Sequence, residues 1–104
     1  YARMLEERSE LVKAMDLSLA DVDALVLPTT PIVAPTMDEI STTKGFNTAN
    51  RLLLRNTAIA NFFDLCAISL PMGGVLPTGL MLFGRRGCDR RLLEIAASVE
   101  RLLS

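Results

Sequence analysis

Serine, cysteine and lysine side chains are the groups of this chain that could perform covalent chemistry, and the sequence contains no histidine to activate them. Without an imidazole, neither a Ser-His-Asp nor a Cys-His nucleophile can be assembled. A lysine can replace histidine as the base only where burial lowers its pKa. Lys13 lies on the charged side of a predicted helix and Lys44 in a polar segment, so both are expected to be solvated. Ser69 lies in an apolar run and is interpreted as a small core residue. We therefore expect no catalytic residue in this chain.

Cysteine usage bounds the possible metal and redox chemistry. Cys66 and Cys88 are the two thiols, and two thiols without histidine do not make an ordinary zinc site. Gly73 and Gly74 lack the lysine and serine or threonine of a phosphate-binding loop, so they indicate a turn between strands. We expect no metal and no cofactor. A pair of unlinked thiols is typical of the reducing cytoplasm, so we expect a cytoplasmic protein. A disulfide between the two thiols is the alternative.

Charge and hydropathy limit the kinds of partner. The net charge is −1, which gives no electrostatic surface for nucleic acid. Four arginines gather at residues 85–91, but acidic residues lie among them and a solvated turn explains the cluster. No apolar run reaches the roughly 18 residues of a membrane span. Half of the residues are apolar, which favours surface that meets more protein, either the rest of a longer chain or a second copy.

The first predicted element is a helix over residues 1–20. Its apolar residues recur at helical spacing and form one stripe: Leu5, Val12, Met15, Leu19 and Val22. Charged residues lie mostly off this stripe. No capping residue precedes Tyr1, so we expect the native helix to start further upstream.

The remaining chain predicts alternating strands and helices. Apolar runs at residues 23–27, 67–70 and 80–83 are interpreted as strands buried on both faces. Prolines make residues 28–36 an irregular loop, and residues 37–46 are expected to form an exposed loop. A second helix is expected to begin at a cap on Asn47 or Thr48 and to end near residue 63. Asp89 is expected to cap a final helix with its stripe at Leu92, Ala96, Val99 and Leu103. The fold class is therefore α/β, with a mixed sheet of about three strands and three covering helices.

Four short motifs in a fixed order connect the chain to a known family. They are Asp23–Pro31 with Ala34 and Pro35; Asn61 with Ala67–Pro71 and Gly73; Leu76–Gly84; and Leu92, Leu93, Ala96 and Glu100. Together they resemble the C-terminal segment of the amidase signature family, the Ser-Ser-Lys amide hydrolases. The resemblance implies that residues 1–104 are a part of the larger amidase signature fold and are incomplete without upstream residues. It also implies that the Gly/Ser-rich nucleophile loop and the lysine motif of the family are not in this chain.

The resemblance implies a role in a substrate pocket. By motif position, the family's pocket wall corresponds to Thr29 and Thr30 in the proline-rich loop and to Arg55, Thr57 and Asn61 on the second helix. Arg55 is the candidate for binding a substrate carboxylate or carbonyl, and a solvent-facing Arg55 is the equal alternative. Asn61 is expected to hold loop backbone rather than to touch substrate.

Two functions follow from these expectations. The first is the C-terminal portion of an amidase that hydrolyses a carbon-nitrogen amide bond through an acyl-enzyme, inactive as this chain alone. Its partners would be the upstream portion of the same amidase and a small amide substrate, without nucleic acid or membrane. The second is a non-catalytic interaction or assembly module that retains the tail of the amidase fold. The apolar strands favour a homodimer of the isolated chain, whereas a stable monomer would favour the second function.

Overall fold

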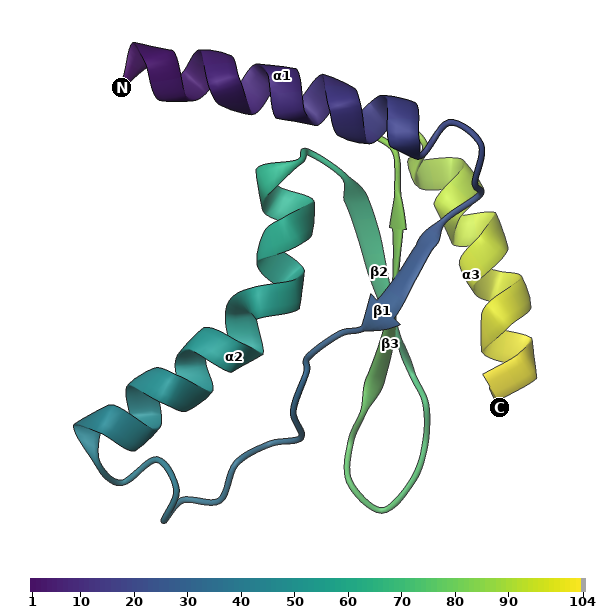
Figure 1. Cartoon of the computed structure of the whole chain (residues 1–104). Helices are drawn as coiled ribbons and strands as arrows, with labels where there is room; N and C mark the ends of the chain where they lie inside the picture. The colour runs from purple at the N-terminus through teal and green to yellow at the C-terminus, as the bar shows by residue number, and fades with distance from the viewer. Residues whose placement is uncertain (104) are drawn as a thin grey trace.

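The computed structural model describes residues 1–103 as three helices and three strands (Figure 1). In chain order they are α1 (Ala2–Ser18), β1 (Leu25–Pro28), α2 (Thr43–Phe62), β2 (Cys66–Pro71), β3 (Gly79–Gly84) and α3 (Asp89–Leu103). The mixed α/β class expected from the sequence is therefore confirmed.

The strands form one antiparallel sheet in the order β1-β3-β2. β3 is central, and its apolar residues are buried on both faces, as the sequence pattern predicts. Leu82 lies opposite Val26 on one side and Ile68 on the other, while Met81 lies opposite Leu27 and Ser69. The turn from β2 to β3 includes Gly73 and Gly74 at positive φ, where glycine has no steric cost. The predicted turn between strands is confirmed.

The two edge strands correct one expectation. β1 and β2 were expected to be buried on both faces, but each alternates between a more buried and an exposed side chain. Ala67, Ser69 and Pro71 are exposed on β2, whereas Ile68 and Leu70 pack inward. The reason is that each edge strand is covered by a helix on one face, whereas β3 is covered on both. Ser69 is thus a surface residue and not the core residue expected from its apolar neighbours.

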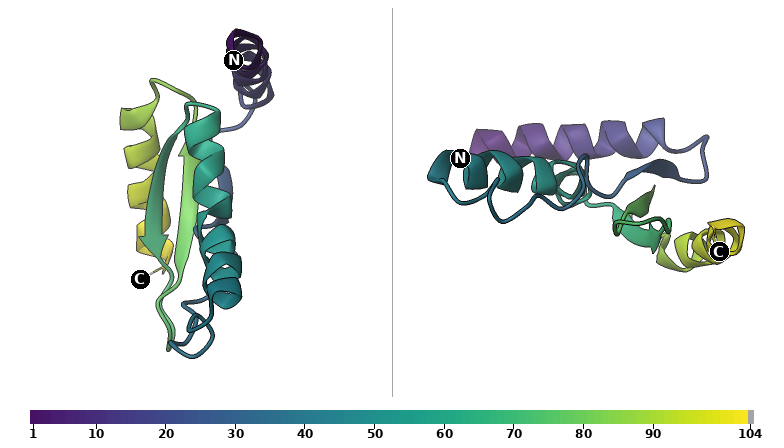
Figure 2. Two further views of the ribbon diagram at one scale, coloured as in Figure 1. Left: turned by 90° about the vertical axis from the view of Figure 1, so that its left-hand side faces the viewer. Right: turned by 90° about the horizontal axis from the view of Figure 1, so that it is seen from below.

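Different helices cover the two faces of the sheet (Figure 2). The apolar stripe of α3, with Leu92 and Ala96, packs on the face that carries Leu70 and Leu82. On the other face, Ala60 near the end of α2 packs against Met81 and Phe83. α1 lies across one end of the sheet instead of covering a face, and Val12 is its one buried residue. The sequence predicted three covering helices, whereas α2 and α3 each cover a face and α1 covers neither.

α2 begins earlier than the sequence predicted. The Oγ1 atom of Thr42 accepts a hydrogen bond from the backbone N–H of Gly45 at 3.0 Å, which makes Thr42 the cap in place of Asn47 or Thr48. Gly45 was interpreted as part of a loop, yet it lies in the first turn of the helix. A Cβ there would come within 2.1 Å of the carbonyl oxygen of Glu39. Glycine is therefore required by a close backbone approach and does not break the helix.

The molecule is a thin plate and not a sphere. Its extents are 43 × 43 × 16 Å and its radius of gyration is 16.1 Å. A compact domain of this length has a radius of gyration of about 13 Å. Helix α1 and the start of α2 project away from the sheet, which accounts for the larger radius of gyration (Figures 1 and 2).

Candidate functional site

A pair of hydroxyl groups marks one end of the sheet, on the face covered by α2. Thr29 follows β1 and Ser69 lies on β2, and their Oγ atoms are hydrogen-bonded to each other across β3. The two side chains meet above Gly79, where a Cβ would come within 2.6 Å of the Thr29 hydroxyl and 2.7 Å of the Ser69 hydroxyl. The absence of a side chain at Gly79 is therefore what allows the hydroxyl pair to form.

The hydroxyl pair lies in an open hollow of about 390 Å³. Its lining consists of hydroxyl-bearing residues, prolines and one glycine: Thr29, Thr30, Ser69, Pro71, Pro77, Thr78 and Gly79. The Thr30 hydroxyl donates to the carbonyl oxygen of Ile32 at 2.8 Å, which fixes the proline-rich segment in place. Neutral hydroxyl groups on a rigid backbone can hydrogen-bond an amide but carry no base to activate a nucleophile. The hollow is suited to binding rather than to bond cleavage.

A buried amide ties α2 to this end of the sheet. Asn56 is 7% exposed and is the buried polar residue among those described. Its Nδ2 atom donates to the carbonyl oxygen of Pro28 at 2.8 Å, and its Oδ1 atom accepts from Nε of Arg55 at 3.3 Å. The sequence analysis gave Asn56 no role. The sequence feature that could have indicated its role is an amide side chain on a helix face that otherwise carries apolar and small residues.

Asn56→Ala is expected to lower the free energy of unfolding of the full-length protein by about 1–3 kcal/mol, because the partly buried hydrogen bond to the Pro28 carbonyl is lost. Urea unfolding measures this. Asn50→Ala is the control, since Asn50 lies on the same helix but is exposed. Equal losses for the two variants would contradict the anchoring role of Asn56.

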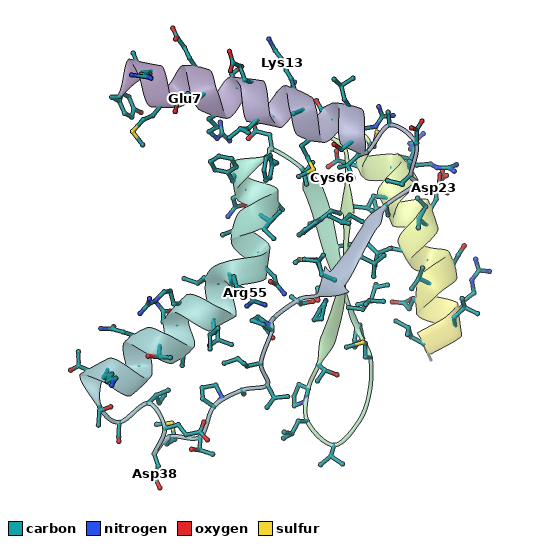
Figure 3. The ribbon with its side chains drawn as sticks, viewed as in Figure 1. Glu7, Lys13, Asp23, Asp38, Arg55 and Cys66 are labelled. Carbon is teal, nitrogen blue, oxygen red and sulfur yellow. The ribbon has the colours of Figure 1, made fainter. Side chains whose placement is uncertain are left out.

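Arg55 lies on a different surface from the hydroxyl hollow. Figure 3 labels it where α2 passes the segment that follows β1. Its exposed side chain, with those of Thr48, Arg51 and Leu52, lines a groove of about 280 Å³. The Asn56 amide connects the two places, because it bonds both Arg55 and the residue before Thr29.

The other two predicted pocket residues lie apart from Arg55. Thr57 is half-buried, and its hydroxyl donates to the carbonyl oxygen of Leu54 at 3.2 Å. Side chains two positions apart on a helix point about 200° away from each other. Thr57 therefore cannot share the groove that Arg55 lines. The carbonyl oxygen of Asn61 accepts from Nη2 of Arg8 at 3.2 Å, while its side chain is exposed. The five predicted residues thus divide among the hydroxyl hollow, the arginine groove and a third surface of α2.

Arg8 joins α1 to the end of α2, which sequence reasoning missed. Its Nη2 atom lies 2.8 Å from Oδ1 of Asp64, and its guanidinium lies over the ring of Phe62 at 5.7 Å from the centroid. The partners are 56 residues apart in the sequence, so no local pattern could reveal them.

The Cys66 thiol offers no reactive centre. Burial raises the pKa of the Cys66 thiol, and the nearby Asp89 carboxylate raises that pKa further. A raised pKa keeps the thiol protonated at neutral pH and therefore weakly nucleophilic. Within residues 1–103 both cysteines are free and no three potential metal ligands lie together. In the same range no helix has the length and apolar character to cross a membrane.

Comparison with known proteins gives the class of this chain. A protein-family model described as Amidase matches residues 1–93. The chain is 40% identical over 86 residues to the 2-amino-5-chloromuconic acid deaminase of Comamonas testosteroni, a match covering 80% of this chain and 19% of that protein. It is 34% identical over 105 residues to a glutamyl-tRNA(Gln) amidotransferase subunit of Saccharolobus solfataricus, covering 97% of this chain and 21% of that protein.

A solved structure agrees with these sequence matches. The corresponding glutamyl-tRNA(Gln) amidotransferase subunit of Thermotoga maritima superimposes with a TM-score of 0.67 and 29% identity, over 86% of this chain and 20% of that one. The fold is therefore a part of the amidase signature architecture, and the chain belongs to the amidase family. It spans about a fifth of the length of the curated relatives that it matches.

Proposed function

We propose that these residues are the C-terminal portion of an amidase that hydrolyses a carbon-nitrogen amide bond through an acyl-enzyme. The nucleophilic serine, the relay serine and the lysine base lie in the upstream portion of the same protein. The observation that carries the proposal is the match of residues 1–93 to the family model. The chain also has only about a fifth of the length of its relatives. The names of those relatives, a deaminase and a subunit of an amidotransferase, denote reactions at carbon-nitrogen bonds.

The contribution of this chain is structural support and one wall of the substrate pocket. Thr29 and Thr30 line the open hollow, and a hydrogen bond from Thr30 to Ile32 fixes the backbone that carries them. Their hydroxyl groups can hydrogen-bond the substrate amide there. Arg55 lines a separate groove, and the Asn56 amide connects that groove to the segment that carries Thr29. Thr57 and Asn61 belong to another surface of α2, and in this proposal they contact the upstream portion.

The thin shape supports an upstream partner. The accessible surface is 7624 Å², whereas a compact protein of 11.4 kDa exposes about 5,800 Å². The excess of about 1,800 Å² has the size of an extensive permanent interface. In the proposed enzyme the upstream portion covers it. The two free thiols accord with a cytoplasmic protein, which is part of the proposal.

The second candidate is a non-catalytic assembly module. The purified chain of 104 residues, on its own, is expected to hydrolyse simple amides at the background rate, because it contains no histidine and, in this proposal, the nucleophilic serine and its lysine base lie upstream. The full-length protein is expected to hydrolyse them. Release of ammonia from short aliphatic amides measures both reactions.

The controls separate the two candidates. Turnover by the isolated chain that disappears on Ser69→Ala would overturn the assignment of catalysis to the upstream portion. A full-length protein without activity on any amide would favour the assembly module. In contrast, activity of the full-length protein that survives Ser69→Ala places the nucleophile elsewhere, as proposed.

A further inference from the structure

We propose that Arg51 and Arg55 bind a carboxylate group of the substrate, so that the amide which the enzyme hydrolyses carries an acidic group. This inference rests on the amidase function proposed above and names the substrate class of the same pocket wall. It adds Arg51, which sequence reasoning did not select.

The two arginines form a pair on one face of α2. They are four residues apart, so their side chains project from the same side of the helix. Both are exposed, and together with Thr48 and Leu52 they line the groove of about 280 Å³. Planar guanidinium groups bind carboxylates with two parallel hydrogen bonds, which a lysine cannot do. The groove therefore has the size and the donors for a small acid.

The positive charge of this pair is not compensated within residues 1–103. Arg3, Arg8 and Arg91 each have a carboxylate partner among the described residues. Arg51 and Arg55 have no ion pair there, and like charges at this spacing weaken a helix slightly. An occupant with a negative charge would offset that repulsion.

A hydrogen bond positions the Arg55 side chain for such an occupant. Its Nε atom donates to Asn56 at 3.3 Å, and Asn56 is in turn fixed by the Pro28 carbonyl at 2.8 Å. With Nε engaged, the two terminal amino groups of the guanidinium remain to bind both oxygens of a carboxylate. The same amide keeps the arginine beside the segment that carries Thr29.

The test compares two amides with the same four-carbon chain on the full-length protein: succinamate, which ends in a carboxylate, and butyramide, which ends in a methyl group. Arg55→Ala is expected to lower kcat/KM for succinamate roughly 10- to 100-fold, the range for one charge-assisted interaction. The value for butyramide is expected to change by less than about 2-fold. Arg51→Ala should act in the same direction, and Arg55→Lys should recover part of the loss.

Lys44→Ala is the matched control, because it removes an exposed positive charge from the same helix and should leave both substrates unchanged. A second readout does not depend on activity: succinate should raise the melting temperature of the wild type but not of Arg55→Ala.

The outcomes separate this inference from the function on which it rests. Hydrolysis of butyramide with no preference for succinamate would overturn the carboxylate site and leave the amidase function standing. Equal losses for both amides, with a lower melting temperature, would show that the arginines pair with an acid of the protein itself. No hydrolysis of either amide, with an arginine-dependent effect of succinate, would retain the site and refute the amidase function. Absence of the succinate effect in the wild type would overturn the site.

Discussion

Phe83→Ala is expected to lower the free energy of unfolding of the full-length protein by about 3–5 kcal/mol, enough to consume much of the stability of a small domain. Phe83 is 0% exposed and lies on the central strand, where it packs against Ala60 of α2. The loss has two parts: the transfer of the ring to water and the cavity that remains. Urea unfolding with a constant slope measures it.

Phe46→Ala is the matched control for this variant. Phe46 is also a phenylalanine, but it is 51% exposed at the start of α2. Its removal is expected to cost less than about 1 kcal/mol where it meets water. A loss as large as that of Phe83→Ala would show that the upstream portion covers the start of α2. A small loss at Phe83 itself would contradict the packing of α2 on the sheet.

The fold could be predicted where a pattern depends on neighbours in the sequence. The stripe of α3 is regular, and the structure places Leu92 and Ala96 in the core as predicted. β3 is apolar throughout and is buried on both faces. The edge strands have a similar composition but one open face each, because burial depends on which helix lies above them. No local pattern states that α2, rather than α1, would cover the second face.

The candidate site was only partly predictable for the same reason. Motif position led to Thr29 and Thr30, which line the hydroxyl hollow. Ser69 was dismissed because its neighbours are apolar, yet the alternation of an exposed strand face brings it to Thr29, 40 residues away. Asn56 acts through the Pro28 carbonyl, a contact across 28 residues. Such pairings arise from the register of the sheet and the docking of α2, which sequence spacing does not encode.

The isolated chain of 104 residues is expected to self-associate. Its surface exceeds that of a compact protein of its mass by about 1,800 Å². If half of this excess were apolar, leaving it in water would forfeit on the order of 20 kcal/mol, more than the whole stability of a small domain. A two-fold dimer is the simplest way to cover such surface, since each copy offers the same patch to the other. Sedimentation at micromolar concentration measures the mass.

The projecting α1 provides the test of which surface pairs. Along its N-terminal half an apolar stripe is exposed, made of Tyr1, Met4, Leu5 and Leu11. Met4→Glu, at a position 70% exposed within the stripe, is expected to shift the dimer toward monomer or to unfold the chain. Leu17→Glu is the control, because Leu17 is 76% exposed on the opposite side of the same helix and should leave the mass unchanged. A wild-type chain that sediments as a folded monomer would contradict the prediction. That result would also favour the assembly module, because 104 residues would then be stable without covering this surface.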